Sequence, residues 1–114
     1  MKVDRLTPAP SQKTQFAWSH HATLPDLPGC YALATYAGDV LYVGLATTSI
    51  RSRVESHLDS PLKRKGVEHL GVPFWVHYIL RPAIEVGPIE RGWMNTAILE
   101  DGEMPPLNRV YSPL

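Results

Sequence analysis

The sequence predicts a small α/β domain in which a central three-stranded, mainly antiparallel sheet is flanked by helices. Two observations predict this class. Strand-like and helix-like segments follow one another in the order strand, strand, helix, strand, helix. Eleven prolines and eight glycines among 114 residues also divide the chain into short elements, which is unlike a helical bundle. Because 44% of the residues are hydrophobic, one compact core is expected, and the length suits a single domain.

The first two strands form a predicted hairpin. Residues 30–36 (CYALATY) and 40–44 (VLYVG) are rich in β-prone residues, and the Ala-Gly-Asp segment between them is a short turn. Residues 73–80 (PFWVHYIL) are a third strand, because aromatic and β-branched residues dominate them. The polar, proline-containing residues 1–27 are interpreted as a lead-in arm to a catalytic domain at 28–114.

Two helices complete the predicted domain. Helical spacing joins four residues of the first one, and Thr48 or Ser49 is its expected N-cap: Ile50, Val54, His57 and Leu58. The second helix is predicted over residues 89–100, with Pro88 near its first turn. Residues 59–72 between them are expected to be a loop, and the residues after 100 an irregular tail.

Composition excludes several classes of protein. Basic and acidic residues are equal in number, so the formal net charge is zero, which counts against tight non-specific binding of nucleic acid by the whole surface. A single cysteine, Cys30, excludes an internal disulfide and a cysteine-rich zinc cluster. No apolar segment is long enough for a signal peptide or a membrane span. We therefore expect a soluble, intracellular (cytoplasmic) protein without a membrane partner.

Five short motifs follow one another between residues 28 and 108. They are GCY at 29–31, YVG at 42–44, SIRSRVESH at 49–57, IERGWM at 89–94 and PPLN at 105–108. In this order they resemble the GIY-YIG nuclease superfamily. The resemblance implies a GIY-YIG-like domain acting as a metal-dependent endonuclease, a hydrolase of phosphodiester bonds with DNA as the expected substrate. The alternative is a catalytically inactive domain of this type that binds nucleic acid or a protein.

The resemblance also implies roles for four catalytic side chains. Tyr31 and Tyr42 match the two motif tyrosines, and one of them, preferably Tyr42, activates or orients the attacking water. Arg53 clamps the phosphate and stabilises the charge that develops on it. His57 hydrogen-bonds the phosphate or assists proton transfer. Each also has an ordinary structural explanation, because tyrosines pack across hairpins and arginines lie on solvated helix faces.

The remaining site residues concern the metal and the support of the site. Glu90 matches the family glutamate, which ligates one Mg²⁺ or Mn²⁺ ion. An alternative alignment, anchored on the C-terminal motif, puts the uncharged Asn95 at that position and predicts an inactive enzyme. Gly44 and Asn108 are supporting residues. Gly44 lets the backbone approach the ligand closely, and Asn108 braces the site.

Contact with nucleic acid is predicted at the only dense basic cluster, in residues 59–72. It consists of Lys63, Arg64 and Lys65, which are expected to touch the duplex backbone. No zinc finger, helix-turn-helix or heptad repeat accompanies the motifs. Either specificity is therefore low, or target choice comes from a homodimer or from a separate specificity partner.

Overall fold

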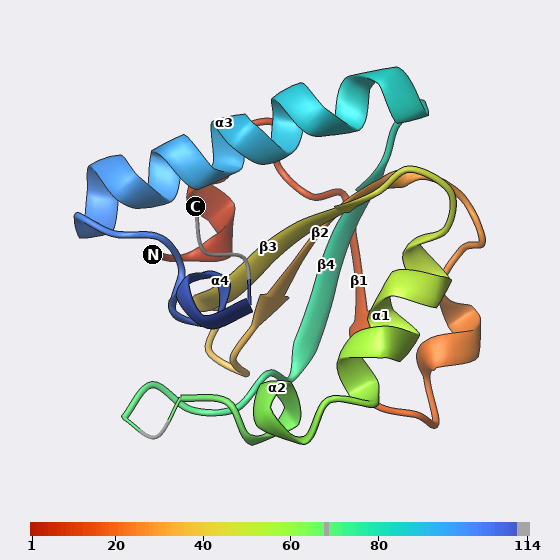
Figure 1. Cartoon of the computed structure of the whole chain (residues 1–114), viewed down its shortest axis with the longest axis horizontal. Helices are drawn as coiled ribbons and strands as arrows, with labels where there is room; N and C mark the ends of the chain where they lie inside the picture. Colours follow the sequence, from red (N-terminus) through yellow and green to blue (C-terminus); the bar gives the residue numbers. More distant parts are fainter. Residues whose placement is uncertain (68, 112–114) are drawn as a thin grey trace.

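The chain forms a four-stranded antiparallel sheet with helices on both faces (Figure 1). The computed structural model describes residues 1–67 and 69–111. The strands are β1 (Gln12–Gln15), β2 (Gly29–Ala34), β3 (Val40–Ala46) and β4 (Trp75–Leu80). Their order in the sheet is β1-β4-β2-β3, so β3 and β1 are the edge strands. The α/β class is confirmed.

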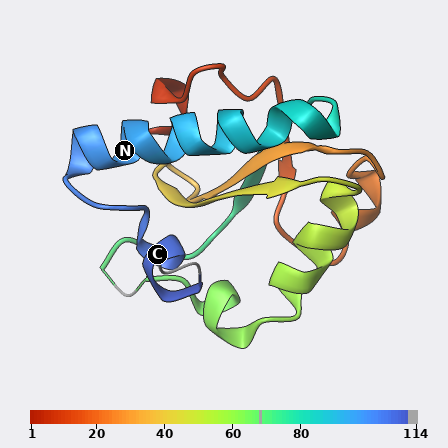
Figure 2. The same ribbon diagram turned by 45° about the horizontal axis from the view of Figure 1, so that its top comes forward.

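The helices lie on opposite sides of this sheet. They are α1 (Ile50–Leu58), α2 (Pro61–Lys65), α3 (Ala83–Asp101) and α4 (Pro106–Tyr111), with two 3₁₀ turns, η1 (Val3–Arg5) and η2 (His21–Thr23). Figure 2 shows the long α3 across one face, with α1 and α2 on the other. Among the described helices, none combines the length and the apolar character that a membrane span requires.

Strand β2 is the centre of the sheet, and all its residues are buried. Pairing with β3 places Tyr31 opposite Gly44 and Leu33 opposite Tyr42. Because side chains alternate along a strand, Tyr31 and Leu33 face α1, whereas Cys30 and Ala32 face α3. Tyr31 and Tyr42 therefore share the α1 face, with ring centroids 6.2 Å apart.

Each face of the sheet carries its own hydrophobic core. The first core lies under α1 and α4 and contains these buried residues: Phe16, Leu24, Tyr31, Leu33, Leu41, Tyr42, Ala46, Ile50, Val54, Leu58, Val76, Tyr78 and Leu107. The second core lies under α3 and contains Leu6, Cys30, Ala32, Val40, Val43, Ile79, Val86 and Trp93. Both cores include residues from the first 27 positions.

The N-terminal segment is part of the sheet, so the sheet has one strand more than predicted. Residues 12–15 (QKTQ) pair with β4 at the edge, although their polar composition gives no strand signal. The division between an arm at 1–27 and a catalytic part at 28–114 stays a prediction about chemistry. Structurally, the two segments share one sheet and both cores.

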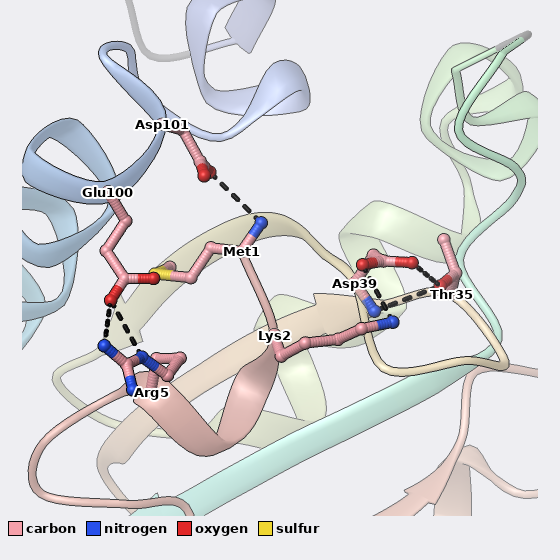
Figure 3. A network of polar contacts seen from close by, with 7 residues as sticks. All are labelled: Met1, Lys2, Arg5, Thr35, Asp39, Glu100 and Asp101. Atoms are coloured by element: carbon pink, nitrogen blue, oxygen red, sulfur yellow. Dashed lines mark hydrogen bonds and ion pairs between the residues drawn. The ribbon is translucent and has the colours of Figure 1, made fainter.

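Ion pairs fasten the start of the chain to distant elements (Figure 3). The Met1 amino group lies 3.2 Å from Asp101, and Arg5 pairs with Glu100, both at the end of α3. Lys2 lies 3.0 Å from Asp39 in the hairpin turn, and the Asp39 amide donates to the Thr35 hydroxyl. Exposed pairs of this kind contribute little each, and the burial of Leu6 in the second core is the stronger anchor.

Three predicted boundaries were wrong. Helix α3 begins at Ala83 rather than at residue 89, and Pro88 lies inside it. The expected loop 59–72 contains α2, which Ser60 caps and Pro61 begins. The expected irregular tail contains α4. The N-cap of α1 is confirmed as Ser49, whose side chain accepts a hydrogen bond from the Ser52 amide at 3.1 Å.

Candidate active site

Helix α1 presents a histidine to the core and an arginine to the surface. Ile50, Val54 and Leu58 form its buried stripe, and His57 lies beside that stripe with only 3% of its surface exposed. Arg53, one turn earlier, is exposed. Arg51, on the same helix, makes a different contact: the guanidinium of Arg51 donates to the Leu24 carbonyl at 2.8 Å.

The Tyr31 hydroxyl is buried beside this helix. Its oxygen lies 2.5 Å from Nε2 of His57, and the side chain has no exposed surface. The ring lies over Gly44, where an added Cβ would come within 2.7 Å of the Tyr31 hydroxyl and 2.9 Å of the Tyr42 ring. Only glycine leaves this space, so the glycine of the YVG motif makes room for the tyrosine hydroxyl.

Arg53 and Glu90 both act electrostatically on that hydroxyl. Burial raises the pKa of the Tyr31 phenol, and the neighbouring Tyr42 raises it further. Arg53 opposes this shift through its charge and a side-chain hydrogen bond, whereas Glu90 adds to it. The charges of Arg53 on α1 and of Glu90 on α3 therefore both influence the pKa of this phenol, although Tyr31 faces α1 and α3 covers the opposite face of the sheet.

His57 is hydrogen-bonded at both ring nitrogens. Nε2 faces Tyr31, and Nδ1 lies 2.7 Å from Nζ of Lys63 on α2. The Tyr42 ring packs edge-on against the imidazole, with centroids 4.8 Å apart. Burial lowers the pKa of His57 to about 3, with Lys63 and Arg53 adding to the shift. The imidazole is therefore neutral near pH 7.

Glu90 is the carboxylate of α3 with the features of a metal ligand. It is half-buried, and burial raises its pKa although Arg91 opposes the shift. No described residue forms a hydrogen bond or ion pair with its carboxylate. Asn95 is exposed on the same helix. Within the described ranges, no three His, Cys, Asp or Glu residues gather in a metal-binding cluster. One free carboxylate still fits Mg²⁺, which usually keeps several waters and takes one or two carboxylates.

Asn108 on α4 clamps the edge strand. It is 1% exposed, its Oδ1 accepts from the Val43 amide at 2.8 Å, and its Nδ2 donates to the Val43 carbonyl at 2.9 Å. Val43 lies between Tyr42 and Gly44, so the two hydrogen bonds hold the stretch of β3 that packs against Tyr31. This contact is what a bracing residue requires.

The predicted basic cluster divides into two kinds of residue. Arg64 and Lys65 are exposed, as a backbone contact requires, whereas Lys63 is half-buried and faces His57. Sequence reasoning missed this contact. The available signal was Ser60-Pro61, which is a helix start and implies that Lys63 lies on a helical turn rather than in a loop.

A surface hollow of about 150 Å³ adjoins the first turn of α1. Its lining combines hydroxyl groups and one guanidinium: Thr47, Thr48, Ser49, Ser52 and Arg53. Amide groups at a helix start and an arginine together attract anions. Arg53 lines this hollow, and its charge also lowers the otherwise raised pKa of Tyr31.

Comparison with known proteins finds a local likeness. No protein-family profile matches the chain. Over 37 residues the chain is 54% identical to UvrABC system protein C of Anaeromyxobacter dehalogenans strain 2CP-C. Over 36 residues it is 56% identical to UvrABC system protein C of strain 2CP-1 / ATCC BAA-258. Each alignment covers 32% of this chain and 5% of the relative. The likeness is consistent with a GIY-YIG-like domain.

Proposed function

We propose that this chain is a metal-dependent endonuclease that hydrolyses phosphodiester bonds in DNA. One observation carries the proposal: the buried Tyr31 hydroxyl contacts His57 while Arg53 and Glu90 act on it from two other elements. The local likeness to UvrABC system protein C supports a role on DNA. The order of the five motifs supports the reaction class.

Substrate binding is assigned to Arg53 and the hollow at the start of α1. A phosphodiester carries one negative charge, and the guanidinium can donate two parallel hydrogen bonds to its oxygens. The hydroxyls of Thr48 and Ser52 line the same hollow. We assign the exposed Arg64 and Lys65 to the neighbouring phosphates of the strand.

We assign the general base to Tyr31 rather than to Tyr42, which the motif match prefers, because the Tyr31 hydroxyl contacts His57 whereas Tyr42 packs its ring against the imidazole. In its ionised form the phenol oxygen accepts a proton from the attacking water, whose oxygen forms the new bond to phosphorus. The bond from phosphorus to the leaving oxygen breaks, and that oxygen takes a proton from solvent. Burial raises the pKa of this phenol, and the positive charge of Arg53 partly opposes that rise, which favours the phenolate relative to a site without the arginine. Tyr42 packs against His57 and holds the imidazole in place.

Glu90 is assigned as the protein ligand of one Mg²⁺ or Mn²⁺ ion. When bound, such an ion stabilises negative charge on the phosphate oxygens. The carboxylate is half-buried and has no protein partner in the described ranges, so it is available to a cation. Because the charge of Asn95 is zero and its side chain is exposed, we assign no ligand role to it.

Plasmid cleavage in Mg²⁺ and in Mn²⁺ tests the proposal. We expect the wild-type protein to nick supercoiled DNA, and Arg53→Ala to lose about 100-fold in rate because it removes a charge-stabilising donor. Glu90→Gln is expected to cut only at background level. Glu85→Gln, an exposed glutamate in the first turn of the same helix, is the matched control and should cut normally.

A folded wild-type protein that binds DNA without cutting it in either metal would favour the second candidate, a non-catalytic binding domain. The zero net charge, which counts against tight binding of DNA by the whole surface, favours the form of this candidate that binds a protein partner. Under either function, we propose that sequence preference comes from a homodimer or a separate partner, and sedimentation with and without DNA measures the first of these.

A further inference from the structure

Lys63 points into the site instead of away from it. Its Nζ lies 2.7 Å from Nδ1 of His57 and 5.0 Å from the centre of the Tyr42 ring. The Ser60 side chain accepts a hydrogen bond from the Lys63 amide at 3.4 Å, which fixes the first turn of α2. The neighbouring Arg64 and Lys65 remain exposed. Lys63 is therefore placed by the fold for a contact inside the protein.

The chemistry of this contact determines the direction of the next hydrogen bond. A lysine ammonium has three donors and no acceptor, so Nδ1 of His57 has to accept. A neutral imidazole carries one N–H group, which must then be on Nε2. That N–H donates to the Tyr31 oxygen, 2.5 Å away. The chain of donors runs from Lys63 through His57 to Tyr31.

We propose that Lys63 is a positioning residue that holds His57 in the Nε2–H tautomer, so that His57 donates a hydrogen bond to the Tyr31 oxygen. Without Lys63, the imidazole is free to carry its hydrogen on Nδ1 and to accept from the Tyr31 hydroxyl. The hydrogen bond then reverses and favours the protonated phenol, which is not a base. This catalytic consequence rests on the proposed function, whereas the tautomer does not.

The tautomer is measured directly by long-range ¹H–¹⁵N NMR of the histidine rings at pH 7 without added metal. A His57→Gln variant identifies the signals of His57 among the five histidines. We expect a protonated Nε2 and a bare Nδ1 in the wild type and in Lys63→Arg, since a guanidinium also only donates. Lys63→Met is expected to move the hydrogen to Nδ1 in a large share of molecules. Lys65→Met should leave the spectrum unchanged.

Cleavage kinetics test the consequence for the reaction. We expect Lys63→Met to lower kcat by about 10- to 100-fold with little change in KM, as is usual for a residue that orients a reacting group. Lys63→Arg should recover most of that loss, and Lys65→Met should change KM alone.

The outcomes separate the two proposals. A hydrogen on Nδ1 in the wild type, or the same tautomer in Lys63→Met, overturns the inference. A change in KM alone for Lys63→Met also overturns it and makes Lys63 a substrate contact. The expected tautomers in a protein that does not cut DNA overturn the proposed function and leave the tautomer assignment standing.

Discussion

The two faces of the sheet bury different kinds of residue. Under α3, the residues of the second core are apolar, and the buried indole Nε1 of Trp93 donates to the Pro8 carbonyl at 3.0 Å. Under α1, the first core is lined by a phenol and an imidazole hydrogen-bonded to each other and to a lysine. Burying polar groups costs free energy unless they are paired, and apolar residues of similar shape are often at least as stable. We infer that stability dominates one face and chemistry the other.

The largest effect on stability is expected from the α3 face. Trp93→Ala removes a fully buried indole from the second core, which should lower the free energy of unfolding by about 3–5 kcal/mol. Urea denaturation measures this loss. Leu99→Ala, on the exposed side of the same helix, is the control and should stay within about 0.5 kcal/mol. If Trp93→Ala lowers the free energy of unfolding only slightly, the α3 face is not the main source of stability and the contrast between the two faces fails.

Asn108→Ala should have the next largest effect. It leaves the buried amide and carbonyl of Val43 without their partners, at a cost of about 2–3 kcal/mol. Because these hydrogen bonds hold the part of β3 next to Tyr31, we also expect cleavage to fall. Hydrogen exchange at the Val43 amide is the local measurement. Protection equal to that of the wild type would show that the clamp is not needed.

Acid should weaken the α1 face in a defined range of pH. The pKa of His57 is lowered to about 3 in the folded protein, against 6.5 for an ordinary histidine. In the unfolded chain His57 therefore binds a proton below pH 6.5, whereas in the folded protein it stays neutral down to about pH 3. The contribution of the neutral His57 to stability is fully present above pH 6.5. At lower pH the free energy of unfolding should decrease by up to about 1.4 kcal/mol per pH unit. Urea titrations at pH 6.5 and 5.5 measure the slope, which His57→Gln should reduce. An unchanged slope would contradict the burial of a neutral imidazole.

The amino-acid sequence predicts elements whose signals are local. Hairpin strands β2 and β3, strand β4 and the Ser49 cap follow from β-branched runs, a tight turn and an N-cap residue. Strand β1 could not be predicted, because its polar residues are stabilised by pairing with the distant β4. The early start of α3 was hidden because Gly87 and Pro88 are helix breakers, which tertiary packing on the sheet overrides here.

Site prediction divides in the same way. Motif order identifies Tyr31, Arg53 and Glu90, and the charges of Arg53 and Glu90 shift the pKa of Tyr31 in opposite directions. Their catalytic roles stay predictions. For the contact between Lys63 and His57, Ser60-Pro61 indicates the helical turn that carries Lys63, but the contact itself depends on how the turn at Asp59 and Ser60 folds α2 back against α1. Residue types and their order indicate the chemistry of a site, whereas the hydrogen-bond partner of each side chain depends on how the chain folds.

The double variant Tyr31→Phe/His57→Leu tests the central claim most directly, with plasmid cleavage and urea denaturation measured on the same preparation. Replacing Tyr31 and His57 with apolar residues leaves neither of them unpaired, and Lys63, which loses its contact with His57, is only half-buried, so we expect the free energy of unfolding to change by less than about 1 kcal/mol. Cleavage should fall by about 100-fold or more. A variant that cuts as fast as the wild type would show that the buried polar groups serve no chemistry. A variant that fails to fold would show that they are there for stability.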